Sequence, residues 1–169
     1  MGIREYIEKV ERLQQSIGRV PEKVSEVVRE NQEVLLSLNR DQMLLGRDAE
    51  GNTLTPGYLD DPYFDTPEQA EAYANMKYRL ESDHRTRIEN PTIYPDKDRN
   101  TPNLIVTGPF QDNMFILPES DSFLIGSTYP EAKDIDSKYN GKVFGIAPAS
   151  RDYFYRNYIH PTLLRLLRS

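Results

Sequence analysis

Cysteine is absent from the 169-residue chain. This absence excludes disulfide bonds, zinc–thiolate sites and catalysis by a thiol. Long apolar runs are absent as well, since none approaches the roughly 20 residues that a membrane-spanning helix needs. The charged opening of the sequence, MGIREYIEKVER, is not typical of a signal peptide. We therefore expect a soluble protein that is made in the cytoplasm and has no membrane partner.

Basic residues are missing from residues 48–76, which carry seven carboxylates, whereas residues 151–169 carry four arginines and one acid. A nucleic-acid-binding domain usually has a dominant basic face, so we expect no sequence-specific nucleic-acid binding. Two alternatives remain: subunits that meet head to tail through opposite charges, or two solvated surfaces. In the first alternative, the candidate interface residues are Asp60, Asp61, Asp65, Arg151, Arg156, Arg165 and Arg168.

Apolar residues at three- and four-residue steps predict a helical N-terminal part over residues 1–46. The first helix should run from Ile3 to Gly18. A second, longer helix should have Pro21 in its first turn and should end before Gly46. Its apolar side needs a partner, which is either the sheet of this chain or a neighbouring subunit.

Residues 59–103 are interpreted as an insertion or an extended arm. A helix within them should begin after Thr66, because Pro67 and Gln69 complete a capping box. Residues 82–103 contain three prolines, and each disfavours helix in the residue before it. This segment is either an arm that reaches a neighbouring subunit or an ordinary surface loop.

Residues 104–169 should form the sheet and the C-terminal helices. Three apolar runs predict strands over 103–108, 113–117 and 122–128. Near-continuous apolar strands need cover on both faces, which we expect the N-terminal helices to supply. A short helix should end before Gly141, and an amphipathic C-terminal helix should be kinked or restarted at Pro161. The prediction is one α+β domain, with helices packed on a small, mostly antiparallel sheet.

Residues that could carry chemistry are sparse. The two histidines, His84 and His160, are isolated in the sequence. The turn at residues 46–58 lacks the alternating ligands of a calcium loop. No nucleophile elbow or phosphate-binding loop is present. We expect no catalytic residue, metal or cofactor. Two alternatives are left open. One is a small metal- or ligand-dependent enzyme or binding domain that uses His84 or His160 with the carboxylates Asp60, Asp61 and Asp65, and the other is a regulatory or inhibitor protein that binds one host partner.

The order of several short motifs resembles the head–tail joining, tail-completion and minor virion proteins of tailed bacteriophages and prophages. In that group a helix passes into a G-x-D-x-x-G turn, and a T-G-x-F motif follows. A helix ending in K-Y-G, an F-G pair and a final helix come next. The matching residues are Gly46, Asp48, Gly51, Leu104, Thr107, Gly108, Phe110, Lys138, Tyr139, Phe144 and Gly145. The resemblance covers roughly residues 27–58 and 104–168.

This resemblance implies a structural protein without catalytic activity. Such proteins form rings at the head–tail connector, neck or tail end, and they join portal, neck or tail proteins. We therefore expect a homo-oligomeric ring located in the virion, and in the host cytoplasm during assembly. Under this interpretation the apolar sheet is a scaffold, while the helices and charged surfaces make the contacts.

Overall fold

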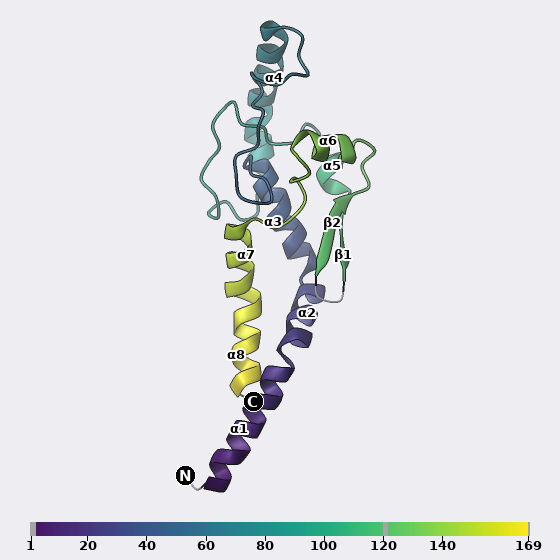
Figure 1. Cartoon of the computed structure of the whole chain (residues 1–169). Helices are drawn as coiled ribbons and strands as arrows, with labels where there is room; N and C mark the ends of the chain where they lie inside the picture. Colours follow the sequence, from purple (N-terminus) through teal and green to yellow (C-terminus); the bar gives the residue numbers. More distant parts are fainter. Residues whose placement is uncertain (1–2, 120–121, 169) are drawn as a thin grey trace.

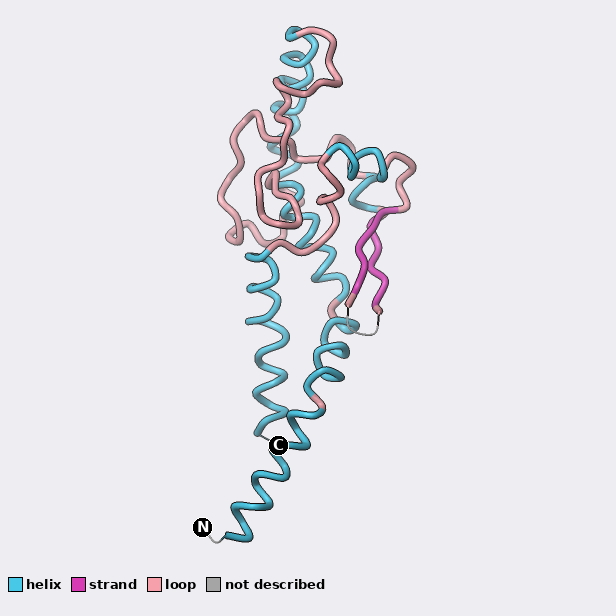
Figure 2. Tube along the Cα trace, viewed as in Figure 1, coloured by secondary structure: helices cyan, strands magenta, loops and turns pink. Residues whose placement is uncertain are grey.

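The computed structural model describes residues 3–119 and 122–168. The fold is α+β, as predicted, with helices at both ends of the chain and an antiparallel sheet of two strands between them. The molecule is elongated (Figure 1; Figure 2). Loops and short helices gather at one end, and the N-terminal helix projects from the other end.

Three consecutive helices form a bent rod along the molecule (Figure 1). They are α1 (Ile3–Gly18), α2 (Val20–Glu30) and α3 (Gln32–Leu44). The first helix ends at Gly18 and Pro21 stands in the first turn of the next, as predicted. The expectation of one long second helix is wrong, because the helix breaks at Asn31. The Asn31 side chain donates to the Val27 carbonyl at 2.7 Å, and such local bonds compete with regular helix.

The central helix α3 is buried on nearly all sides, with Leu35, Leu38 and Met43 in the core. Its polar side chains are also used. The Asn39 amide donates to the Val143 carbonyl at 3.1 Å. The Gln42 amide joins two backbone groups, donating to the Gly145 carbonyl at 2.6 Å and accepting from the Ala147 N–H at 3.0 Å. These bonds fasten the irregular segment 143–147 to the helix.

The two strands form a hairpin beside α2 and α3 (Figure 1). They are β1 (Met114–Pro118) and β2 (Phe123–Ser127), with Ile116 opposite Ile125. Ile116 and Ile125 are buried in the core, whereas Leu117 and Leu124 are 55% and 50% exposed. The expectation that helices cover both faces is therefore wrong: one face packs against the core and the other remains open.

The strand predicted over residues 103–108 does not form. Leu104 has a φ of 50°, which is incompatible with an extended strand. The backbone carbonyls of this segment form hydrogen bonds with side chains and not with a neighbouring strand. The pairs are Leu104 with Gln111, Ile105 with Lys77, and Val106 with His84. Because these backbone acceptors already have partners, the segment needs no sheet.

Residues 59–103 pack on their own chain. Helix α4 (Pro67–Arg85) begins at the predicted capping box, where the Thr66 hydroxyl accepts from the Gln69 N–H at 3.3 Å. The loop that follows wraps around the body, and the Tyr94 hydroxyl lies 2.9 Å from the Ser150 hydroxyl in the core. The loop around Tyr94 is therefore held against its own chain. The arm and the surface loop both remain predictions.

The remaining helices include the short helix before Gly141 and the helical C-terminus that were predicted, and one short helix at Pro109–Asp112 that was not. They are α5 (Pro109–Asp112), α6 (Ala132–Lys138), α7 (Pro148–Phe154) and α8 (His160–Arg168), with a π-helical segment at Tyr155–Ile159 before α8. Pro161 has no N–H to donate to the Asn157 carbonyl, and the helix widens just before it. The His160 N–H donates to the Tyr155 carbonyl in the wider turn. The chain stays helical from α7 through this wider turn into α8, so Pro161 marks a local widening and not a new start.

Candidate assembly surfaces

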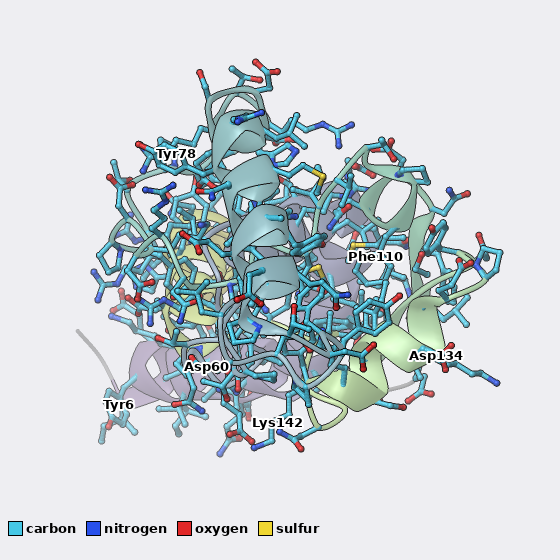
Figure 3. All side chains as sticks on the ribbon, turned by 90° about the horizontal axis from the view of Figure 1, so that it is seen from above. Tyr6, Asp60, Tyr78, Phe110, Asp134 and Lys142 are labelled. Atoms are coloured by element: carbon cyan, nitrogen blue, oxygen red, sulfur yellow. The ribbon has the colours of Figure 1, made fainter. Side chains whose placement is uncertain are left out.

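The apolar side of α1 is uncovered. Its apolar residues form one stripe along the helix, as their spacing predicts. The residues of this α1 stripe are Ile3, Tyr6, Ile7, Val10, Leu13 and Ile17. No residue of α1 is buried, and Ile3 and Tyr6 are 83% and 62% exposed. Seen along the molecule, Tyr6 points outward, whereas Phe110 lies among the side chains of the body (Figure 3).

An amphipathic helix normally buries its apolar side against another element. Here α1 contacts α8 and its neighbour in sequence α2, and its N-terminal part projects beyond α8 (Figure 1). Contiguous apolar surface left in water is typical of an interaction site. The α1 stripe is therefore the first candidate assembly surface.

A second uncovered apolar surface lies between the two long helical parts. A groove of about 460 Å³ runs between α2–α3 on one side and α7 with the π-helical segment on the other. The apolar lining of this groove includes Val24, Val28, Leu35, Phe123, Ile146 and Phe154. Glu119 and Arg151 are exposed at its rim. Grooves of this kind receive the apolar face of a helix.

The acidic interface candidates are partly used within the chain. Asp61 pairs with Lys138, and its side chain is only 8% exposed. Asp60 accepts from the Asn100 amide at 3.2 Å. Asp65 is exposed. Asp60 and Asp65 are therefore the two that remain accessible to a partner.

The basic candidates lie on α7, the π-helical segment and α8, away from these acids. Arg156 pairs with Asp152 at 2.9 Å, and Arg165 donates to the Thr162 hydroxyl at 3.1 Å. Arg151 and Arg168 are exposed. The structure brings none of these arginines to the acidic segment: α8 points toward one end of the molecule, while α4 lies at the other (Figure 1).

The G-x-D-x-x-G motif forms a structural turn. The Asp48 carboxylate accepts from the Glu50 and Asn52 N–H groups at 2.9 Å and 2.8 Å. Gly46 and Gly51 have φ values of 69° and 87°, which favour glycine. The motif follows α3 and reverses the direction of the chain.

The other motif residues also support packing. The rings of Phe110 and Phe144 lie 5.6 Å apart, and Tyr139 is buried. A Cβ on Gly145 would lie 2.9 Å from the Ala49 Cβ, so the F-G pair lets the turn after α3 approach closely. Gly108 has a φ of 109° at the start of α5, and Thr107 is exposed. The motifs therefore build the scaffold, and they do not converge on a reactive centre.

A buried lysine was missed by sequence reasoning. Lys77 is buried in α4 and donates to the Ile105 carbonyl. Burial, followed by the charge of Lys97, lowers the pKa of Lys77 to about 7. The sequence did contain a signal for the burial of Lys77, because Lys77 lies on the same helix face as the buried Ala70 and Ala74.

Lys77 also lines an aromatic hollow of about 570 Å³. The aromatic residues of its wall are Tyr58, Tyr63, Phe64, Tyr73 and Tyr139. Two cations of this chain already lie over these rings: Lys77 is 5.7 Å from the Tyr58 centroid and Lys138 is 5.8 Å from the Tyr139 centroid. Two rings of the hollow therefore already stabilise lysine side chains of the chain itself. The hollow can also admit an apolar group.

The two histidines lie on different helices. His84 is buried on α4, where its Nε2 lies 3.1 Å from the Val106 carbonyl oxygen and its Nδ1 lies 3.0 Å from the Asn103 amide. Burial lowers the pKa of His84. His160 is exposed at the start of α8, with its ring 5.8 Å from that of Tyr155. Over residues 3–119 and 122–168, no three His, Cys, Asp or Glu side chains form a metal-ligand group.

Comparisons with protein-family models, curated proteins and solved structures gave no match. None of the helices in the described part of the chain is long and apolar enough to span a membrane. In the described part of the chain, the α1 stripe and the apolar groove are two apolar surfaces that the packing leaves uncovered.

Proposed function

We propose that this protein is a structural assembly protein: a component of a tailed-phage virion that forms a ring at the head–tail connector, neck or tail end and joins neighbouring virion proteins. The observation that supports this proposal most is the α1 stripe. An apolar helix face that lies outside the body of its own chain is typical of a subunit that packs against a neighbour. The phage context rests on the resemblance of the motif order.

The distribution of charge adds support. Residues 48–76 carry seven carboxylates and no basic residue, whereas residues 151–168 carry four exposed arginines and one acid; α4 itself also carries the exposed Arg79 and Arg85. Contact between the acidic segment of one subunit and the basic segment of the next would be head to tail. Such heterologous contacts close into a ring when the rotation between subunits permits it.

No observation favours the alternative of a metal- or ligand-dependent enzyme to the same degree. His84 is already engaged with Val106 and Asn103, and His160 lies on another helix. The motif residues serve packing, as described above. A stoichiometric metal bound by the purified chain, and lost on changing either histidine, would favour this alternative.

The test is the mass of the purified chain by light scattering, alone and mixed with the products of adjacent genes. We expect a large oligomer of defined mass in at least one sample, visible as a ring by electron microscopy. A variant without residues 1–18 should lose this oligomer and keep its folded body, because α1 contributes no buried residue. A strict monomer that binds none of these neighbours would contradict the proposal.

A further inference from the structure

The α1 stripe continues an interface that the chain already has. The main apolar positions of the stripe recur every seven residues, and this repeat continues in the sequence through α2. The two series are Ile3, Val10, Ile17 and Val24, and Tyr6, Leu13, Val20 and Val27. A seven-residue repeat is the pattern of helices that pack side by side with interlocking side chains. The helix α2 contacts α8, and Val27 of this face is buried while Val24 lines the groove. In α1 the same face has no helix beside it over most of its length.

The apolar groove offers a receiving surface of matching chemistry. Its floor is formed by buried residues, among them Leu35 and Phe154. Its walls include Val28 of α2 and the half-exposed ring of Tyr155. A helix binds such a groove through apolar side chains at positions i, i+3, i+4 and i+7. Ile3, Tyr6, Ile7 and Val10 have this spacing.

We infer that the α1 stripe of one copy of this chain docks in the apolar groove of the next copy. The inference rests on the proposed function and names the contact that would build the ring. Each copy carries one donor helix and one acceptor groove, so a closed ring satisfies every stripe and every groove. The contact joins two different surfaces, and so it is heterologous and propagates from copy to copy.

Geometry favours a second copy as the occupant, and charge permits it. The helix α1 cannot enter its own groove, because Arg19 alone separates it from α2 and the rod carries α1 away from the groove (Figure 1). The chain has a net charge of −6, so copies repel each other except where the contact surfaces are neutral. Such neutrality is present: α1 has three acidic and three basic side chains. The groove rim carries one of each sign, Glu119 and Arg151.

The natural absence of cysteine allows a direct test by disulfide cross-linking. One variant, Ile7→Cys, places a thiol on the α1 stripe, and a second, Tyr155→Cys, places one at the groove wall. The two proteins are mixed, oxidised and separated on a non-reducing gel. The matched control is Glu8→Cys, which places its thiol on the opposite side of α1. Each variant is also oxidised alone.

We expect the mixture of Ile7→Cys with Tyr155→Cys to form a cross-linked dimer at least tenfold more efficiently than the mixture of Glu8→Cys with Tyr155→Cys. A chain with both Ile7→Cys and Tyr155→Cys should form a ladder of dimers, trimers and larger species. A dimer from Ile7→Cys alone, without the mixed product, would overturn the inference in favour of pairing between two α1 helices. The inference would also be overturned if light scattering shows the chain to be oligomeric and the mixture of Ile7→Cys with Tyr155→Cys still gives no cross-linked dimer. That result would leave the proposed assembly function intact.

Discussion

Replacing Lys77 by methionine removes a buried amine and keeps a flexible side chain of similar length. Burial lowers the pKa of Lys77 from 10.5 to about 7, with the charge of Lys97 as the second cause. Between these two pH values the unfolded chain holds a proton that the folded chain has released. The free energy of unfolding of the natural protein therefore rises with pH through this window. Below pH 7 the cost of burying the cation is fully present.

The size of the effect follows from the same pKa values. One pKa unit corresponds to about 1.4 kcal/mol. The free energy of unfolding of the natural protein, relative to that of Lys77→Met, should therefore rise by about 2 kcal/mol between pH 6.5 and pH 9. Loss of the bond to the Ile105 carbonyl costs about 1 kcal/mol at every pH and does not change the slope. Tyr58 and Tyr139 keep their protons through this range, because burial raises the pKa of both phenols.

The measurement is urea unfolding at pH 6.5, 7.5 and 9 and constant ionic strength, followed by circular dichroism. Lys133→Met is the control, because Lys133 is exposed on α6 and should leave the pH profile unchanged. Parallel pH profiles for the natural protein and Lys77→Met would refute the reasoning, since they would mean that Lys77 titrates as an ordinary amine in the folded state.

Three further predictions concern other parts of the chain. The double variant Ile3→Ser, Ile7→Ser removes side chains that are 83% and 50% exposed, so sedimentation should show association weakened by about 2 kcal/mol with an unchanged unfolding temperature; a lowered unfolding temperature would contradict this. Gly46→Ala should destabilise the fold by about 2 to 4 kcal/mol in urea unfolding, because the new Cβ would clash with the loop of residues 97–102 and the position has a positive φ. The control is Gly18→Ala, whose Cβ meets no atom within 4 Å and which should be neutral or stabilising. Gln42→Leu should cost about 2 to 4 kcal/mol in the same assay by leaving two buried backbone groups unpaired, and a neutral result would mean that water replaces them.

Features with a local cause could be predicted from the sequence. Thr66 and Gln69 lie three residues apart, and their hydrogen bond forms within one helical turn. The predicted start of α4 was therefore correct. The end of α1 at Gly18, and the end of the helical N-terminal part just before Gly46, were predicted for the same reason. The stripe of α1 was predicted as well, because helical spacing is a property of neighbouring residues.

Features that depend on distant residues could not be predicted in the same way. The segment 103–108 is as apolar as a strand, but its carbonyls bond side chains up to 28 positions away. No pattern within the segment records those partners. The apolar groove is a stronger case, since its walls come from α2, the hairpin and α7, which are far apart in the chain. Periodicity indicates that a helix face is apolar, but it does not indicate whether another element covers that face.

The bonds of Asn39 and Gln42 have a consequence for the order of folding. They join α3 to residues more than 100 positions later in the chain. During synthesis α3 therefore waits for most of the polypeptide before its polar side chains find their partners, and contacts of such long sequence separation form slowly. The helix α1 contributes no buried residue to the core. Under the docking that we propose, the groove walls from α7 are made last, so an unfinished chain has no complete groove for a neighbour.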